Sequence, residues 1–416
     1  MTKRPQSPSF LDRRAFLARS AALGCSLAAS PLVTPVSLAA TQGDNRLVVI
    51  LLRGGMDGLD VVRPYGDPAY TKLRGDAGLQ GAEGAIDLDG YFALHPALRP
   101  LMPLWRQGHL GFAHAVSTPY RNKRSHFDGQ DLLEAGISTL EDGISRDGWL
   151  NRVLQHLTGA NAQTAYAIGS DQAGVLGGPA AHQRWTPEAD LLLTPQAIKL
   201  ASLIMQDDPA FNAAFRQALA ISDNDGDAVA MTDTPDDMMA AINPKAKTNK
   251  QSLEQRVAEF TGKRLREDTR IASFSINGWD THQGQSRSLP RALSRLSDAI
   301  VTLKDTVRGP VWNKTTVVAV TEFGRTARIN GSKGTDHGTG GLMVMAGGAL
   351  RGGQVLGDWP GLQTSQLYAQ RDLMPTRDVR AYLAWLLHSQ FGLEKSTLET
   401  RIFPDLDMGS APNMIR

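Results

Sequence analysis

Histidine and carboxylate side chains stand close together at two places in the C-terminal half of this 416-residue chain. Asp280 and His282 are two residues apart after an apolar run, and Asp336 and His337 are adjacent in a glycine-rich segment. An aspartate and a histidine at this spacing in an extended loop can turn an oxygen and a nitrogen toward one ion. Asp280, His282 and His337 therefore have the composition of a catalytic zinc site with one open coordination position. The competing interpretation is that each histidine only satisfies loop carbonyls.

A serine surrounded by cations is the candidate nucleophile. Ser125 directly precedes a helical pattern and lies near Arg121 and Arg124. The N-terminus of a helix attracts anions, so a phosphate or sulfate group would bind there, and the hydroxyl would be placed for in-line attack. Ser125 with Asp128 also has the pattern of a capping box, in which the hydroxyl only accepts a hydrogen bond from a backbone amide. Capping serines greatly outnumber nucleophiles, so this pattern taken alone favours the cap.

These residues need a scaffold that brings distant loops together, and the apolar pattern predicts one. Apolar runs typical of buried strands occur at 46–52, 110–116, 165–168, 271–276, 316–320 and 342–346. Helical patterns occur between and after them at 98–106, 127–135, 149–157, 209–219, 253–267, 289–307 and 378–391. The alternation predicts an α/β fold with a doubly wound, mostly parallel central sheet and helices on both faces.

In a sheet of this kind, ligands bind beyond the carboxyl ends of the strands. The polar residues that follow the predicted strands are therefore the candidates for a site, and they form four groups: Arg53 with Asp57 and Asp60; Ser125 and His126 with Asp128; Asp280 with His282; and Glu322 with the later Asp336 and His337. Only the tertiary fold can decide which of these groups meet.

The first forty residues have the pattern of a twin-arginine export signal. Arg13 and Arg14 precede a weakly hydrophobic stretch, and small residues at 37–40 offer a cleavage site. We expect a mature chain from about residue 41, a single domain over 41–416 with a soft, charged excursion around 222–250, and a periplasmic or secreted location. The twin-arginine translocase would be a partner during export. The alternative is an ordinary basic N-terminal tail.

The cysteine content and the net charge exclude several kinds of metal site and binding partner. The one cysteine, Cys25, lies within the predicted signal, so any metal in the mature chain must be held by histidine and carboxylates. Ala22 stands where a lipoprotein cleavage box usually has leucine, so we do not expect a lipid anchor. A formal net charge of +2 indicates no nucleic-acid surface, and no later segment is apolar enough to span a membrane.

Six motifs follow one another in fixed order: residues 52–60 (LRGGMDGLD), 94–98 (LHPAL), 124–127 (RSHF), 148–151 (GWLN), 279–282 (WDTH) and 321–326 (TEFGRT). Together with the predicted signal, they resemble the bacterial family catalogued as domain of unknown function 1501. That family is in turn similar to the alkaline phosphatase-like superfamily of phosphatases, sulfatases and phosphodiesterases. The resemblance implies two metals and a serine or threonine nucleophile beyond the strand ends.

Carried onto this chain, the resemblance places Ser125 at the nucleophile position and one metal site at Asp280, His282 and His337. The second metal site departs from the pattern. Arg53 stands where the superfamily has its first-strand aspartate, and Glu322 begins the segment where it has an Asp-His pair. One divalent metal, zinc before others, is therefore expected rather than two.

Two readings of the altered second site stay open. Asp57 can substitute as a ligand beside Glu322, or Arg53 can replace the second cation with a guanidinium. Asp336 is a further candidate metal ligand. In catalysis, Arg53 and Arg124 would neutralise charge in the transition state, and His126 or Asp336 would assist proton transfer.

The resemblance implies an exported, metal-dependent hydrolase of a phosphate or sulfate ester, carried by a small molecule or a polymer. The serine motif lacks the proline that follows the reactive residue in formylglycine sulfatases, which favours plain ester hydrolysis. The alternative is a catalytically degenerate periplasmic binding or assembly protein that keeps the fold, because an altered second metal site is what decayed catalysis would leave behind.

Overall fold

The computed structural model describes residues 44–76, 78–79, 84–121, 124–141, 147–169, 174–187 and 251–416. Three expectations lie outside these residues: the export signal over 1–40, the helix over 209–219 and the excursion around 222–250. Within the described residues, no helix combines the length and the apolar character needed to cross a membrane.

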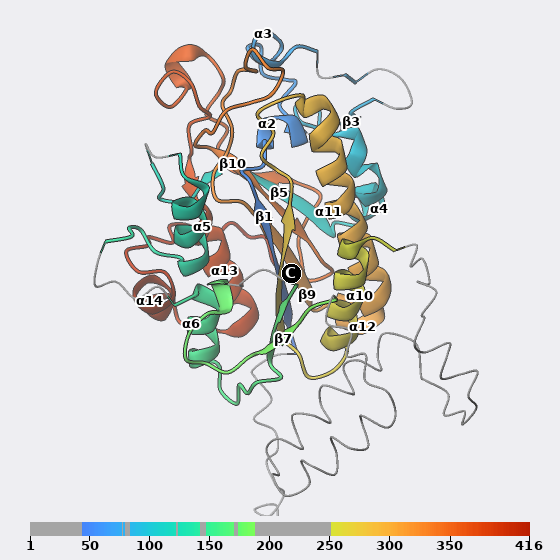
Figure 1. Cartoon of the computed structure of the whole chain (residues 1–416), viewed down its shortest axis with the longest axis vertical. Helices are drawn as coiled ribbons and strands as arrows, with labels where there is room; N and C mark the ends of the chain where they lie inside the picture. Colours follow the sequence, from blue (N-terminus) through green and yellow to red (C-terminus); the bar gives the residue numbers. More distant parts are fainter. Residues whose placement is uncertain are drawn as a thin grey trace, which may run out of the picture.

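A mixed, mostly parallel sheet forms the centre of the molecule (Figure 1). Its strands lie in the order β11-β5-β10-β9-β1-β8-β6-β7, and β12 also pairs with β5. Their bounds are β1 Arg46–Arg53, β5 Leu110–Ser117, β6 Ala165–Ile168, β7 Gln183–Trp185, β8 Ile271–Asn277, β9 Thr315–Val320, β10 Gly341–Ala346, β11 Val355–Leu356 and β12 Arg377–Asp378. Among these strands, β10 alone pairs antiparallel, with β5 and β9. The predicted fold class is confirmed, and each predicted strand ends within one residue of an observed one.

The central strand β1 explains the continuous apolar run that predicted it. Residues 47–52 are at most 2 % exposed, because helices cover both faces of the sheet. Val48, Ile50 and Leu52 belong to one core cluster, and the alternate residues 47, 49 and 51 belong to a second one on the opposite face. A strand buried on both faces has no position for polar functional side chains until it ends. Arg53, the last residue of β1, is therefore the first polar side chain after the apolar run.

The helices divide between the two faces. The first core cluster includes side chains of α4 Met102–Arg106, α10 Leu253–Leu265, α11 Gln285–Val307 and α12 Gly309–Trp312. The second includes side chains of α5 His126–Ala135, α6 Trp149–His156 and α13 Val379–Phe391. Figure 1 shows α10, α11 and α12 on one side of the sheet and α5, α6 and α13 on the other. The short helices are α2 Gly58–Val61, α3 Tyr70–Arg74 and α14 Lys395–Thr397.

One predicted helix is wrong in its first half. The segment 98–106 is α-helical only from Met102, and Pro96–Leu101 forms a 3₁₀ helix instead. Pro100 has no amide hydrogen to donate along an α-helix, and its ring clashes with the preceding turn. Nearby, β2 Val62–Arg63, β3 Ile86–Asp87 and β4 Ala93–Leu94 form a small separate sheet in the order β2-β4-β3.

The topology brings three loops to one edge of the sheet. Strand β1 pairs in parallel with both β8 and β9, so all three carboxyl ends point the same way. The loops that follow them are further joined by backbone hydrogen bonds, from Trp279 to Arg53 and from Thr335 to Thr281. The post-strand groups predicted from the sequence therefore meet at this edge.

Candidate metal centre

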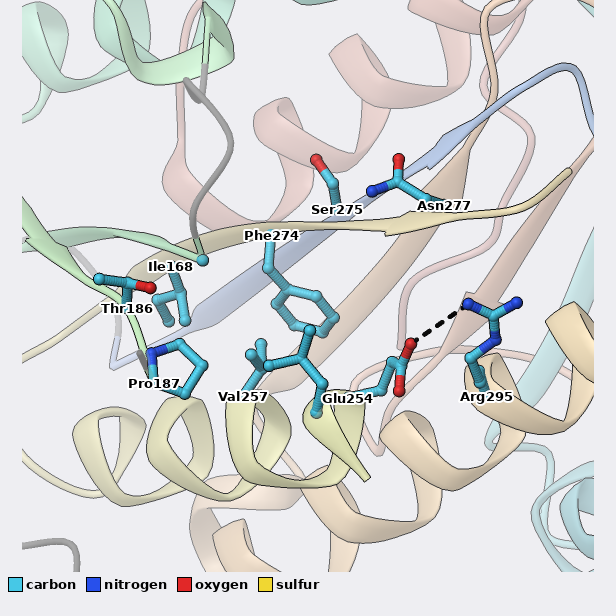
Figure 2. Close-up of a pocket in the computed structure, with 11 residues that line it drawn as sticks. Ile168, Thr186, Pro187, Glu254, Val257, Phe274, Ser275, Asn277 and Arg295 are labelled. Atoms are coloured by element: carbon cyan, nitrogen blue, oxygen red, sulfur yellow. Dashed lines mark ion pairs between the residues drawn. The ribbon is translucent and has the colours of Figure 1, made fainter. Parts of the chain in front are cut away.

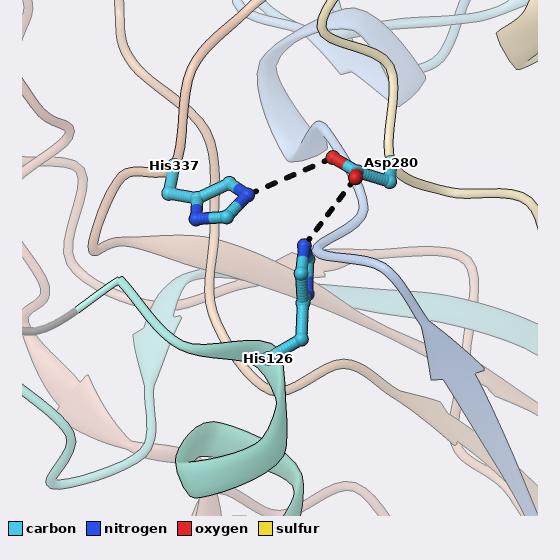
Figure 3. Close-up of side chains that lie close together, drawn as sticks. All are labelled: His126, Asp280 and His337. Carbon is cyan, nitrogen blue, oxygen red and sulfur yellow. Dashed lines mark ion pairs between the residues drawn. The ribbon is translucent and has the colours of Figure 1, made fainter.

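Two histidines and an aspartate from three distant segments converge at this edge (Figure 3). His126 begins α5, Asp280 lies in the loop after β8, and His337 lies in the loop before β10. Each offers a ligand atom within 4.8 Å of the other two. His126 Nε2 lies 3.5 Å from Asp280 Oδ2, and His337 Nε2 lies 3.6 Å from Asp280 Oδ1.

A third imidazole completes the group. His282 Nε2 lies 2.9 Å from His337 Nε2 and 3.1 Å from Asp280 Oδ1. The structure thus brings together the three ligands predicted from the sequence and adds His126, which had been predicted only as a proton carrier. The sequence held a signal for it, since His126 lies in the RSHF motif, but nothing in its spacing relates it to Asp280.

Every histidine of this group has its other ring nitrogen held by an acceptor. The Nδ1 contacts are His126 with Glu322 Oε1 at 2.8 Å, His282 with Asp336 Oδ1 at 3.2 Å and His337 with the Arg124 carbonyl at 3.0 Å. An acceptor at Nδ1 favours the tautomer with the proton there, so each Nε2 presents a lone pair to the centre. Metal-binding histidines are oriented in this way.

Two observations show that the donor set fits a cation. His126 Nε2 is buried and has no hydrogen-bond partner among the described residues, a costly arrangement for a polar atom. Ligand atoms of a tetrahedral zinc ion lie about 3.3–3.4 Å apart, given the usual zinc–nitrogen and zinc–oxygen distances. Four of the six separations among these ligand atoms, at 2.9, 3.1, 3.5 and 3.6 Å, scatter around that value, with His126 measured to Oδ2 of Asp280 and the other two histidines to Oδ1.

The charge of Asp280 is maintained by a buried arginine. Arg325 has no exposed side-chain surface, and its Nη2 donates to Asp280 Oδ1 at 2.6 Å. Partial burial opposes ionisation of the carboxyl, but the hydrogen bond and charge of Arg325 outweigh it and lower the pKa of Asp280. The sequence reasoning missed Arg325 as a site residue, although it belongs to the TEFGRT motif.

Glu322 is a buried acceptor behind His126. Its side chain is 1 % exposed, and Oε1 accepts from His126 Nδ1, from the Gly54 amide at 2.9 Å and from Gln130 Nε2 at 3.2 Å. Burial raises the pKa of Glu322, but these donors and the Thr321 hydroxyl lower it overall, so the carboxylate is ionised. With its oxygens engaged in this way, Glu322 orients His126.

Burial keeps the imidazole of His337 neutral. The pKa of His337 falls to about 4, first because of burial and then because of the charges of His126 and Arg325. The pKa of His126 rises, chiefly because of its hydrogen bond to Glu322. At neutral pH, His337 therefore offers the unprotonated nitrogen that a metal requires.

Asp57, expected as a substitute ligand of the second metal site, is engaged in internal contacts. Asp57 is 1 % exposed and pairs with Arg74 at 2.6 Å, while Gln285 donates to the same Asp57 oxygen. These contacts keep Asp57 apart from the three histidines.

Arg53 is held in an internal network. Its Nε donates to Ser275 at 2.9 Å, and its Nη1 contacts Gln130 at 2.9 Å and Glu134 at 2.7 Å. Because Gln130 in turn donates to Glu322, Arg53 is linked to the centre through these two side chains.

Ser125 caps α5, as the simpler sequence reading predicts. Its Oγ accepts a hydrogen bond from the Asp128 amide at 3.3 Å, and its own amide donates to the Tyr120 hydroxyl at 2.8 Å. The residue is partly exposed and directly precedes His126. A cap of this kind leaves the hydroxyl proton free to donate elsewhere.

Two glycines allow the loops to approach this closely. Gly54 has a φ of +125°, and a Cβ there would lie 2.5 Å from the Asp280 amide nitrogen. A Cβ on Gly334 would lie 2.3 Å from the His282 carbonyl. Both contacts are too short for any other residue, so these glycines are required for the loops to meet.

Comparison with known proteins gives a family and remote likenesses. Residues 114–401 match the family model described as "Protein of unknown function (DUF1501)". No significant match was found among curated proteins. Among solved structures, a protein of the alkaline phosphatase superfamily from Vibrio parahaemolyticus is similar at 12% identity and a TM-score of 0.38, over 88% of this chain and 71% of that one.

Two further solved structures come from the Antarctic bacterium TAB5. Its alkaline phosphatase shares 11% identity at a TM-score of 0.33, over 74% of this chain and 92% of that one. A mutant of that enzyme with magnesium bound in its M3 site shares 14% identity at a TM-score of 0.32, over 73% and 90% of the two chains. None of these likenesses assigns an activity to the chain.

Proposed function

The chain belongs to the DUF1501 family of unknown function, and we propose that it is a hydrolase of phosphate or sulfate esters that works with one divalent metal. One observation carries the proposal: three imidazole Nε2 atoms converge with the Asp280 carboxylate, while each Nδ1 is held by an acceptor. Histidines that bind metals are almost always held in this way by an acceptor at the other ring nitrogen.

The metal would be held by His126, Asp280, His282 and His337. Nitrogen and oxygen donors of this kind suit zinc first, and manganese next. When bound, it would supply a Lewis acid that polarises an ester oxygen and neutralises charge. Glu322 would orient one of the imidazoles. We therefore reassign His126 from proton carrier to ligand, because neither of its ring nitrogens is left to exchange a proton with substrate.

Ser125 is the proposed nucleophile. It lies at the N-terminus of a ten-residue helix, beside the ligand His126 and the exposed Arg124. The free amides of the first helical turn favour an anionic phosphoryl or sulfuryl group there. Attack would join Oγ to phosphorus or sulfur, release the alcohol and transfer the hydroxyl proton to it; water would then cleave the serine ester.

The role of Arg53 changes as well. Its guanidinium is engaged by Glu134, Gln130 and Ser275, so we propose that it positions the residues behind Glu322 and does not clamp the substrate. Arg124 remains the candidate for binding substrate oxygens.

A second candidate is a metal-binding protein without turnover. The resemblance implies a second metal near Asp57 and Arg53, but both residues form ion pairs within the protein. A missing second metal favours a protein that has lost catalysis. The same metal centre would then serve binding or assembly, and phosphate and sulfate esters would be left intact.

Metal analysis of the purified protein by mass spectrometry, together with assays on phenyl phosphate and phenyl sulfate, tests both candidates. We expect about one metal per chain, lost in an Asp280→Ala/His282→Ala variant and kept in His182→Ala, a histidine outside the cluster. Ester turnover that disappears in Ser125→Ala supports the hydrolase. Metal without turnover supports the second candidate, and equal, negligible metal in all three proteins overturns both.

A further inference from the structure

Neighbouring strands of the central sheet end at different positions near the metal centre. Strand β6 pairs with β8 only as far as Phe274, whereas β1 continues beside β8 to Asn277. Beyond the end of β6 lies a pocket of about 150 Å³, lined on its β8 side by Phe274, Ser275 and Asn277 (Figure 2). In open α/β sheets, crevices at the carboxyl ends of strands are the usual places for ligands.

The pocket has an apolar floor and a polar rim. Ile168, Val257 and Phe274 form the floor, and Figure 2 shows the Phe274 ring facing Val257 from α10. At the rim, Glu254 and Arg295 form an ion pair at 3.6 Å. A small molecule with one apolar side and one polar edge suits this lining.

The amide of Asn277 is available to such a molecule. The residue is exposed, and its side chain has no hydrogen-bond partner within the part of the chain that the structure describes. An amide can donate and accept at once, so it would recognise a hydroxyl or an ester oxygen.

A short stretch of chain after β8 connects the pocket with the metal centre. Asn277 lines the pocket and Asp280 is a ligand, so their Cα atoms are at most about 11 Å apart. Between them, a Cβ on Gly278 would lie 2.9 Å from Arg295 Nη2. The guanidinium of the rim therefore lies directly against the loop that carries Asp280.

We propose that this pocket binds the organic group of the ester, and that the group is one aromatic ring or an alcohol of similar size. The inference rests on the proposed function for the ester itself. Its size argument is independent, since a pocket of about 150 Å³ has room for a molecule as large as benzene. A methyl ester would leave the pocket unfilled, and a fused ring system would exceed it.

A variant at the rim tests the proposal with little risk to folding. Leu253 lines the pocket and is 45 % exposed, so Leu253→Trp narrows the space from its open side. We expect kcat/KM for phenyl phosphate to fall about tenfold while kcat/KM for methyl phosphate stays unchanged. Val257→Ala, which enlarges the floor, is expected to raise kcat/KM for naphthyl phosphate relative to phenyl phosphate. Equal effects on the aryl and methyl esters would overturn the proposal.

A binding measurement separates this proposal from the proposed function. Phenol carries the ring without the phosphate, and its binding is observed by saturation-transfer NMR with the full chain. Phenol that binds the wild type and binds Leu253→Trp at least fivefold more weakly supports the pocket even if no ester is hydrolysed. Absent phenol binding, or equal binding to both proteins with unchanged metal content, overturns it.

Discussion

The Arg325 guanidinium donates a 2.6 Å hydrogen bond to the Asp280 carboxylate from a position with no exposed side-chain surface. The same side chain donates to the carbonyls of Gly54, Gly55 and Trp279, and to the Thr335 carbonyl at 3.1 Å. One residue therefore joins the loop after β1, the loop after β8 and the segment that leads to His337. The shape of the metal centre depends on this connection.

Replacing Arg325 is expected to destabilise the whole protein. Arg325→Ala would leave several buried carbonyls without a donor, at a cost of about 3–5 kcal/mol in the free energy of unfolding. Arg325→Lys should recover only part of this loss, because an ammonium cannot reproduce the planar fork. Urea denaturation measures both, with Arg328→Ala, an exposed neighbour, as the control. A loss below about 1 kcal/mol in Arg325→Ala would contradict the structural role.

Removing the acceptor behind His126 is expected to weaken metal binding. Glu322→Gln keeps the size of the side chain but loses the charge that orients the imidazole, and changes of this kind typically cost 10–100-fold in metal affinity. Competition with a chromophoric chelator measures the affinity for zinc. Asp305→Asn, an exposed carboxylate on α11, is the matched control and should bind as the wild type does. Unchanged affinity in Glu322→Gln would show that this carboxylate serves folding alone.

The two roles of Ser125 can be separated with a pair of variants. Asparagine caps helices as well as serine does but has no hydroxyl, so Ser125→Asn should keep stability and lose ester turnover. Ser125→Ala should lose turnover and also about 1 kcal/mol of unfolding free energy. Thermal unfolding and an assay with phenyl phosphate measure the two effects. Turnover that survives in the asparagine variant would rule out the serine as nucleophile.

Acid is expected to destabilise the protein partly through His114. This imidazole is 2 % exposed, its Nδ1 accepts from the Ala115 amide, and its Nε2 lies 3.0 Å from the Val62 carbonyl. Burial lowers the pKa of His114 from 6.5 to about 4. Between these values the unfolded chain binds a proton that the folded chain excludes, so stability present above pH 6.5 is lost as the pH falls toward 4.

The size of that loss follows from the two pKa values of His114. Between pH 7 and 4.5 it amounts to about 2 kcal/mol. His114→Gln should therefore show a pH dependence of the unfolding free energy that is smaller by about this amount, even though its stability at pH 7 is lower. His156→Gln, at an exposed histidine, is the control. The same pH dependence in His114→Gln and the wild type would contradict the assignment.

Much of the fold was predictable because buried segments appear in the sequence as runs of apolar residues. Residues 47–52 lie between two helical layers, so every position must be apolar, and the run is visible without any structure. That Asp280, His282 and His337 would lie at one edge of the sheet was predictable for a related reason, since they stand in loop segments directly after or before such runs. The apolar pattern over 98–106 predicted an α-helix, but the first part of this segment belongs to a 3₁₀ helix that contains Pro100. The pattern of apolar residues does not report this effect of proline on the backbone.

The rest of the site was decided only by the tertiary structure. His126 and Asp280 are separated by more than 150 positions, and no local pattern states that they meet. The sequence also could not predict which acid would face the imidazoles, which would orient a histidine and which would form an internal ion pair. Asp280, Glu322 and Asp57 are all carboxylates that follow strands. Their roles depend on which donor each one reaches, namely His126 for Glu322, Arg74 for Asp57 and Arg325 for Asp280. Residue type sets which contacts a side chain can make, and only the packing of distant loops selects among them.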